Sequence, residues 1–307
     1  MAANPDPNLD PNGQIRIIVA GGIMRNTVEA YFENGEWQPL PEEMNKRKYA
    51  ASSVIYQDDQ YRMAVIGGPG IPISLELLNL TERNGGWNEH PLELPELPEL
   101  PFPELCGHVC LAYNNSLLVI GGRSYNVYFD TIYATQLTPP FQSQLLSNMP
   151  QPICYHGAVC YQDKIFIIGG TTGLATRDSV VVFDPDKVNP YEELSPLPYA
   201  VSQMATTVYN DYVYVLGGID NEGNVLNTAI WYNLNTTNHH ILPNMMTRRF
   251  GCTAVTINEA IIVMGGVDEN GNQLNSAEKY NPKKKIWEHF PAMIEARGRA
   301  TTVKWRI

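Results

Sequence analysis

Short apolar runs that end in Gly-Gly recur six times along the chain. The runs are RIIVAGG, MAVIGG, LLVIGG, IFIIGG, VYVLGG and IIVMGG. They are rich in β-branched and aromatic residues, and polar turns containing Asn, Asp or Gly separate them from their neighbours. This pattern is typical of buried β-strands in hairpins, and no amphipathic helical periodicity competes with it. We therefore predict an all-β protein.

The six Gly-Gly pairs are nearly evenly spaced. Their first glycines are residues 21, 67, 121, 169, 217 and 265, so the successive intervals are 46, 54, 48, 48 and 48 residues. Four-stranded propeller blades repeat with a period of about 40–50 residues. The spacing predicts a six-bladed β-propeller of four-stranded antiparallel blades over residues 14–307, with a flexible leader at residues 1–13.

Each repeat has the same predicted strand order. A first strand turns into the Gly-Gly run, a third strand follows after a loop, and a fourth carries a large apolar residue. Trp37, Trp87 and Trp287 mark the fourth strand in three repeats. The fourth strands of the other repeats lack a tryptophan, as at residues 138–149, and are the least clearly predicted.

The two ends of the sequence carry complementary parts of one blade. The chain begins at a second strand, residues 14–22, and ends with a first strand, residues 299–305. Only this last strand is left to complete the N-terminal blade. We expect the C-terminal strand to pair with that blade, because ring closure removes two exposed sheet edges that would otherwise favour aggregation.

Charge and composition narrow the class of partner. Lys and Arg number 21 against 32 Asp and Glu, a net charge of −11, which disfavours generic binding to nucleic acid or anionic membranes. No apolar stretch approaches the roughly 18 residues of a membrane helix. Five cysteines without a CxxC pair fit reduced thiols better than a disulfide framework. We expect a cytoplasmic protein that binds neither nucleic acid nor membrane.

The repeats resemble Kelch motifs, most clearly in NMMTRRFGCTAVTINEAIIVMGGVDENGNQLNSAEKYNPKKKIWEHFPAM. The resemblance covers roughly residues 15–307 and extends to the substrate-binding domain of Kelch-like proteins, in which BTB and BACK domains precede the propeller. It implies a protein-interaction module that recognises substrates for a cullin-RING E3 ubiquitin ligase. The ligase components would bind through BTB and BACK domains, which these 307 residues do not contain. An actin-binding propeller is the alternative, and a small-molecule enzyme is less favoured.

In Kelch propellers, two kinds of loop build the ligand-binding face. One kind leads into each first strand (the lead-in loops), and the other follows each Gly-Gly pair (the Gly-Gly loops). Mapped here, the cations gather in three consecutive blades, which predicts binding of an acidic partner motif because Arg holds a carboxylate with two hydrogen bonds. We call these residues the basic arc: Arg25, Lys46, Arg47, Arg248, Arg249 and Arg297.

The members of the basic arc do not all have the same expected role. An arginine leading into the first strand recurs in the Kelch pattern and often braces neighbouring blades. For Arg249 and Arg297 this structural role is favoured over ligand binding. For the other four residues the two roles remain open.

Further candidates lie in the Gly-Gly loops of the third and fourth repeats. The segment RSYNVYFD, residues 123–130, combines an arginine with aromatic side chains, which is the composition of an interface hot spot. We predict partner contacts for Arg123, Tyr125 and Tyr128, although one or two of these rings could instead pack against the adjacent blade. Arg177 is a weaker candidate of the same kind.

An acidic, proline-rich insertion, ELPELPELPFPEL at residues 93–105, accounts for the interval of 54. Repeated proline favours an extended polyproline-like segment. One hypothesis is that it crosses the binding face and competes with acidic ligands. A solvated surface excursion is the favoured alternative.

Chemistry-bearing residues other than the cations form no clear site. His108 and His156 lie 48 residues apart, as do Cys106 and Cys154, and such side chains can bind zinc or copper. Equivalent positions of neighbouring repeats explain the spacing equally well, and we favour packed side chains. The sequence has no GxSxG, HExxH or phosphate-loop motif. We expect no enzymatic activity, cofactor or metal.

Overall fold

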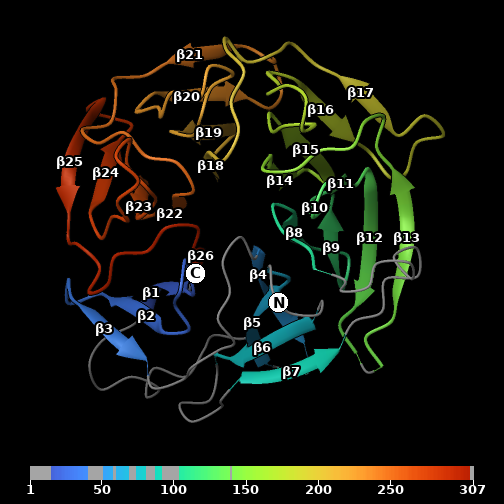
Figure 1. Cartoon of the computed structure of the whole chain (residues 1–307), viewed down its shortest axis with the longest axis horizontal. Coiled ribbons are helices and arrows are strands. Elements are labelled where there is room, and N and C mark those ends of the chain that lie inside the picture. Colours follow the sequence, from blue (N-terminus) through green and yellow to red (C-terminus); the bar gives the residue numbers. More distant parts are fainter. Residues whose placement is uncertain are drawn as a thin grey trace.

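The computed structural model describes residues 15–40, 51–57, 60–68, 74–80, 87–91, 104–138 and 140–304. Within these ranges, six four-stranded antiparallel sheets form a ring (Figure 1). The all-β, six-bladed fold predicted from the repeats is therefore confirmed. No apolar helix of membrane-spanning length occurs in the ranges described.

Each blade runs from a first strand near the axis to a fourth strand at the rim (Figure 1). Blade 1 contains β26 (Thr301–Lys304), β1 (Ile15–Ala20), β2 (Val28–Phe32) and β3 (Trp37–Leu40). Blade 2 contains β4 (Ala51–Gln57), β5 (Gln60–Ile66), β6 (Ser74–Asn79) and β7 (Trp87–Pro91). Blade 3 contains β8 (Val109–Tyr113), β9 (Ser116–Ile120), β12 (Thr131–Gln136) and β13 (Ser143–Asn148).

The other three blades repeat this order. Blade 4 contains β14 (Gly157–Tyr161), β15 (Lys164–Ile168), β16 (Val180–Phe183) and β17 (Tyr191–Glu193). Blade 5 contains β18 (Ala205–Tyr209), β19 (Tyr212–Leu216), β20 (Ala229–Asn233) and β21 (His239–Ile241). Blade 6 contains β22 (Thr253–Ile257), β23 (Ala260–Met264), β24 (Ala277–Asn281) and β25 (Ile286–Phe290). A small extra hairpin, β10 (Arg123–Ser124) and β11 (Val127–Tyr128), lies in the Gly-Gly loop of blade 3.

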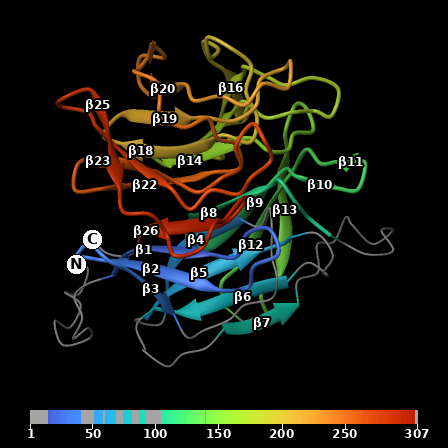
Figure 2. The ribbon, with the colours of Figure 1, turned by 60° about the vertical axis from the view of Figure 1, so that its left-hand side comes forward.

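The two ends of the chain meet in blade 1. Strand β26 pairs antiparallel with β1, so that Ile17 lies opposite Lys304 and Ala20 lies opposite Thr301. Figure 2 shows β26 beside β1 at one side of the ring. The predicted pairing of the C-terminal strand with the N-terminal blade is thus present.

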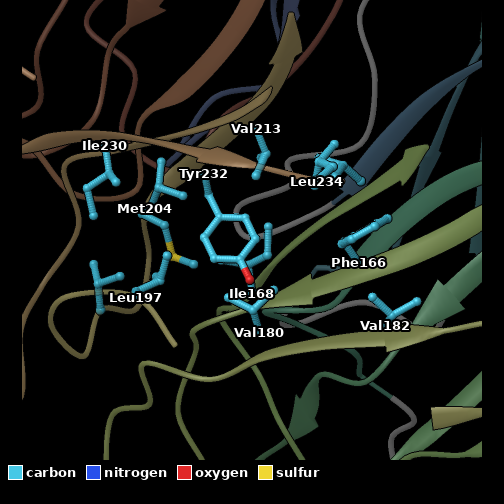
Figure 3. Packing of buried hydrophobic residues seen from close by; sticks show 13 residues of the cluster. Phe166, Ile168, Val180, Val182, Leu197, Met204, Val213, Ile230, Tyr232 and Leu234 are labelled. Atoms are coloured by element: carbon cyan, nitrogen blue, oxygen red, sulfur yellow. The ribbon is translucent and has the colours of Figure 1, made fainter. Parts of the chain in front are cut away.

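The hydrophobic core is divided among the spaces between adjacent blades. Figure 3 shows the cluster between blades 4 and 5, where Ile168 and Val180 of blade 4 lie beside the ring of Tyr232 of blade 5. Tyr232 reaches across the same space, and its hydroxyl donates a hydrogen bond to the Ser195 carbonyl at 2.9 Å. Burial of apolar surface therefore joins each sheet to the next one around the ring.

The Gly-Gly pairs fasten successive blades to each other. Gly217 has a φ of +63°, and a Cβ on it would lie 2.3 Å from the carbonyl oxygen of Arg249 in the next lead-in loop. The N–H of Gly218 donates to that same oxygen at 2.9 Å. Only glycine meets both demands, the left-handed backbone and the close approach. This accounts for the repetition of the pair in every unit.

A second set of backbone hydrogen bonds circles the axis. In four successive blades, a residue with left-handed φ donates its N–H to the carbonyl of the corresponding residue in the blade before it. The bonds run from Tyr155 to Gly107, Gln203 to Tyr155, Gly251 to Gln203, and Arg299 to Gly251, at 2.6–2.9 Å. Positions 48 residues apart thereby become neighbours at the centre of one face.

The fourth strands that lack tryptophan form by other contacts. In blade 4, the ring of Tyr191 packs 5.0 Å from that of Phe183 on the neighbouring strand. In blade 5, His240 lies against Trp231 with ring centroids 5.5 Å apart. Planar side chains thus replace tryptophan at the rim.

Candidate partner-binding face

Lead-in loops and Gly-Gly loops lie together on one face of the ring. In blades 3 to 6, an isolated backbone bridge joins the two loops of the same blade. The bridges are Cys106–Arg123, Cys154–Thr171, Ser202–Ile219 and Phe250–Val267. Side chains from these loops therefore surround the axis on this face, which we call the loop face.

Two members of the basic arc are fully buried. Arg249 donates to the Gly265 carbonyl at 2.7 Å and to Glu278 Oε1 at 2.8 Å. Arg297 donates to the Gly21 carbonyl at 2.7 Å and to Glu29 Oε1 at 2.8 Å. Both guanidinium groups are 0% exposed. They brace blades 6 and 1 and cannot reach a partner without unfolding their loops.

The same buried carboxylates also hold the lead-in loops. Glu278 accepts the backbone N–H groups of Met246 and Thr247 at 2.7 and 3.0 Å. Glu29 accepts those of Ile294 and Glu295 at 2.7 and 3.1 Å. Each arginine–glutamate pair with its loop forms a unit that we call a brace.

Arg25 and Arg248 lie on the loop face but are already paired with acids. Arg25 lies 3.4 Å from Glu295, and Arg248 lies 3.5 Å from Glu269. All four side chains are partly exposed. Because exposed ion pairs are weak and readily exchange partners, these arginines remain accessible to an acidic ligand, but in competition with the protein's own carboxylates. Lys46 and Arg47 lie outside the described residues.

The hairpin β10–β11 presents the predicted hot-spot residues. Arg123 Nε donates to the Tyr155 hydroxyl at 3.1 Å, and its guanidinium lies 5.5 Å from the centre of the Tyr155 ring. Partial burial is the largest single influence on Arg123 and lowers its pKa, but the hydrogen bond to Tyr155 and the charge interactions with Tyr155, Cys106 and Tyr128 together outweigh it, so the pKa of Arg123 lies above its ordinary value. Arg123 is thus a fixed, permanently charged group at the edge of the face.

The two tyrosines of this hairpin have different environments. Tyr125 is 55% exposed and its hydroxyl is 3.4 Å from Glu104 Oε1. Tyr128 instead packs on blade 4, where a Cβ on Gly173 would lie 2.4 Å from its ring. Tyr125 is therefore open to a partner, whereas Tyr128 mainly joins the hairpin to blade 4.

Exposed apolar side chains next to this hairpin were not found by sequence reasoning. Val127 is 47% exposed and Leu174 is 98% exposed, although both are aliphatic. Both lie in Gly-Gly loops, so an apolar residue within those otherwise polar loops was the available signal. With Tyr125 they make up the exposed apolar side chains of the Gly-Gly loops of blades 3 and 4, two loops that meet where the Tyr128 ring packs on Gly173.

The Arg177 side chain is hydrogen-bonded to Gln151 and lines a pocket of blade 4. Its Nη2 donates to Gln151 Oε1 at 2.9 Å, while Nε is buried without a hydrogen-bond partner among the described residues. It lines a pocket of about 350 Å³ between the lead-in loop and the sheet of blade 4. The proline-rich insertion at residues 93–105, for which a surface excursion is the favoured alternative, lies largely outside the described residues, which include only Glu104 and Leu105 of it.

His108 and His156 pack between blades. His108 lies under Gly67 of blade 2, and His156 lies under Gly121 of blade 3, as the atoms nearest to those glycines show. At the corresponding position, Met204 of blade 5 packs in the apolar cluster between blades 4 and 5, and Cys252 of blade 6 packs in the one between blades 5 and 6. No group of three metal-ligating side chains occurs in the part of the chain that the structure describes.

His156 makes stability depend on acid. Burial, with a smaller contribution from His108, lowers the pKa of His156 to about 3. In the unfolded chain, the pKa of a histidine is about 6.5, so between about pH 3 and pH 6.5 the unfolded state binds the proton more readily than the folded state. The free energy of unfolding therefore falls by about 1.4 kcal/mol for each pH unit below about 6.5. Urea unfolding at pH 7.5 and 5.0 should show His156→Met less acid-sensitive than the wild type by about 2 kcal/mol.

The control for this experiment is His239→Gln, because His239 is exposed on β21. It should keep the acid sensitivity of the wild type. Met is chosen because blade 5 carries Met204 at the corresponding position. Equal acid sensitivity of His156→Met and the wild type would contradict the argument.

Comparison with known families agrees with this architecture. The Kelch motif matches residues 152–187, 200–246 and 248–294. Among curated proteins, no match to the chain is found. The matched segments cover β14 to β16 of blade 4 and all four strands of blades 5 and 6, and blades 1 to 3 repeat the same strand order. The three Kelch motifs and the six-bladed ring together support a Kelch-repeat β-propeller.

Proposed function

We propose that this propeller binds a peptide or loop of a partner protein on the loop face. The observation that carries the proposal is the exposed group of Tyr125, Val127 and Leu174 beside the fixed charge of Arg123. Exposed aromatic and aliphatic side chains next to an arginine are the composition of interface hot spots.

An acidic residue of the partner fits the charges around this group. Among the described residues, Arg123 is held by a tyrosine and no direct ion pair with a carboxylate neutralises its charge. Arg25 and Arg248 add charge farther round the ring, after exchange of their exposed partners. We therefore propose that Arg123 is the main contact of the partner's acidic residue, and that Arg25 and Arg248 contribute less to its binding.

The finer assignment is substrate recognition for a cullin-RING ubiquitin ligase. Its support is the Kelch repeat itself together with an exposed loop face suited to a short motif. In such an assembly the partner bound at Arg123 is the substrate, and the cullin is contacted by separate domains. Co-purification of cullin components with the full-length protein is expected, and it should not depend on Arg123.

Charge reversal on the loop face tests the binding proposal. Tagged wild-type protein and the variants Arg123→Glu, Arg25→Glu and Arg248→Glu are used for affinity capture from lysate with quantitative mass spectrometry. Arg123→Glu should lower recovery of a specific partner about tenfold or more, because loss of a hot-spot residue costs about 2 kcal/mol or more. Arg25→Glu and Arg248→Glu should have smaller effects.

Lys284→Glu is the matched control, since Lys284 lies in the exposed turn between β24 and β25 at the opposite end of blade 6. It makes the same change in net charge without touching the loop face. If Arg123→Glu captures the same partners as the control, the site belongs elsewhere. A pocket of about 500 Å³ between blades 6 and 1, lined by Tyr31, Glu259 and Lys279, would then be the next candidate.

A further inference from the structure

Blade 4 lacks the arginine–glutamate brace that blades 6 and 1 contain, and apolar residues stand at the two corresponding positions. Val181 pairs with Ile167, two residues before Gly169, just as Glu278 pairs with Val263, two residues before Gly265. The carbonyl of Ile153 accepts the N–H of Gly122 at 2.8 Å, as that of Arg249 accepts Gly218. Ile153 and Val181 therefore hold the positions of the bracing arginine and glutamate.

This replacement leaves space in the fold. The pocket of about 350 Å³ beside Arg177 is lined by Ile153, Ile167 and Val181, together with Ser179. Ser179 corresponds to Ser276, whose carbonyl and hydroxyl both accept hydrogen bonds from Arg249 in blade 6. Blade 4 thus keeps the apolar walls and the serine of the brace, but not the long charged side chains that fill it elsewhere.

The rim of this pocket is acidic. Asp178 and Glu193 line it with the single cation Arg177, so the ionisable side chains of the lining sum to a formal charge of −1. Neither carboxylate forms an ion pair within the residues described, whereas Arg177 is hydrogen-bonded to Gln151. The remaining wall includes Tyr191, whose hydroxyl donates to Ser147 of blade 3 at 2.9 Å.

We propose that this pocket receives a basic side chain, an arginine or lysine, of the partner polypeptide. Its aliphatic stem would lie along Ile167 and Val181 in place of the stem of a bracing arginine. Its charged end would meet Ser179 and the rim carboxylates, as Arg249 meets Ser276 and Glu278 in blade 6. The proposal rests on the proposed function for the identity of the ligand as a protein, and it adds a second, oppositely charged contact to the one at Arg123.

Single amino-acid probes test this pocket without the natural partner. The probe is N-acetyl-arginine-N-methylamide, titrated into protein carrying ¹³C-labelled Ile and Val methyl groups and followed by NMR. The methyl signals of Ile153, Ile167 and Val181 should shift in a saturable way. N-acetyl-norleucine-N-methylamide, which keeps a stem without the charge, and the N-acetyl-glutamate analogue should both bind at least about threefold more weakly.

Three variants give effects of defined sign. Glu193→Gln should weaken the arginine probe at least about threefold, and Arg177→Gln should strengthen it, because the first removes an attractive charge and the second a repulsive one. Ile153→Arg/Val181→Glu rebuilds the brace of blade 6 and should abolish the methyl shifts. Glu192→Gln is the matched control, since Glu192 neighbours Glu193 on β17, does not line the pocket and pairs with Lys187.

The outcomes separate this proposal from the proposed function. Probe binding that is unchanged by Glu193→Gln, stronger binding of the glutamate analogue, or reversed signs for the two surface variants would each overturn the basic-side-chain assignment. These variants change exposed or partly exposed side chains and so remain informative if the double substitution fails to fold. A negative result here leaves the Arg123 capture experiment unaffected, and failure of that experiment leaves the probe titration valid.

Discussion

Removal of residues 297–307 is expected to destabilise the whole ring. The deletion takes away β26, four residues of which pair with β1, and it exposes the edge of that strand. It also removes Val303 from the cluster that joins blades 1 and 2, and Arg297 from its brace. We expect a loss of about 5 kcal/mol or more and a fall in Tm of about 10 °C or more, measured by calorimetry.

Two additions make this deletion experiment specific. A synthetic peptide of residues 297–307, added in excess, should restore part of the lost Tm, because a ligand that binds the folded state stabilises it. Lys304→Ala in the full chain should melt like the wild type, since Lys304 is exposed. A truncated protein with the Tm of the intact chain would show that β26 does not close the ring.

Substitution of Arg297 by Met should be the most damaging change to a single side chain. It leaves the Glu29 carboxylate buried without its guanidinium partner and removes the bonds to the Gly21 and Thr27 carbonyls. Breaking a buried ion pair in this way costs about 3–5 kcal/mol. Urea unfolding should therefore show a correspondingly lower midpoint for Arg297→Met.

A double-mutant cycle isolates the pair from the rest of the brace. Arg297→Met, Glu29→Gln and the double variant should give a coupling of about 1–3 kcal/mol, because the residues are in direct contact. The exposed pair Lys279–Glu288, 3.0 Å apart, serves as the comparison and should show a clearly smaller coupling. Comparable couplings for the two pairs would contradict the bracing role of Arg297.

The fold was predictable because the Gly-Gly runs mark the same strand in every repeat and so align the repeats with one another. Six Gly-Gly runs gave the number of blades, and the unpaired strands at the two ends predicted closure through β26. The glycines were informative because a left-handed φ and the approach to the next lead-in loop leave no room for another residue, as at Gly217. At the rim, where Tyr191 and His240 replace tryptophan, side-chain size alone was a weaker signal.

The site was less predictable, because loop residues are positioned by contacts between blades. The sequence analysis placed Arg249 and Arg297 among the cations of the basic arc. Their complete burial depends on their ion pairs with Glu278 and Glu29, which lie on other strands. A glutamate in the third strand of both repeats, Glu29 and Glu278, was a signal that could have identified the braces. The exposure of Leu174 and the pocket beside Ile153 follow from packing and had no local marker.

Site-specific crosslinking at Tyr125 tests the central claim most directly. Benzoyl-phenylalanine replaces Tyr125 in one protein and His240, exposed at the rim of blade 5, in a matched control. After irradiation in lysate, we expect a partner adduct at position 125 that is lost with Arg123→Glu, and no such adduct at position 240. Adducts of equal yield at both positions, or at position 240 alone, would contradict partner binding on the loop face.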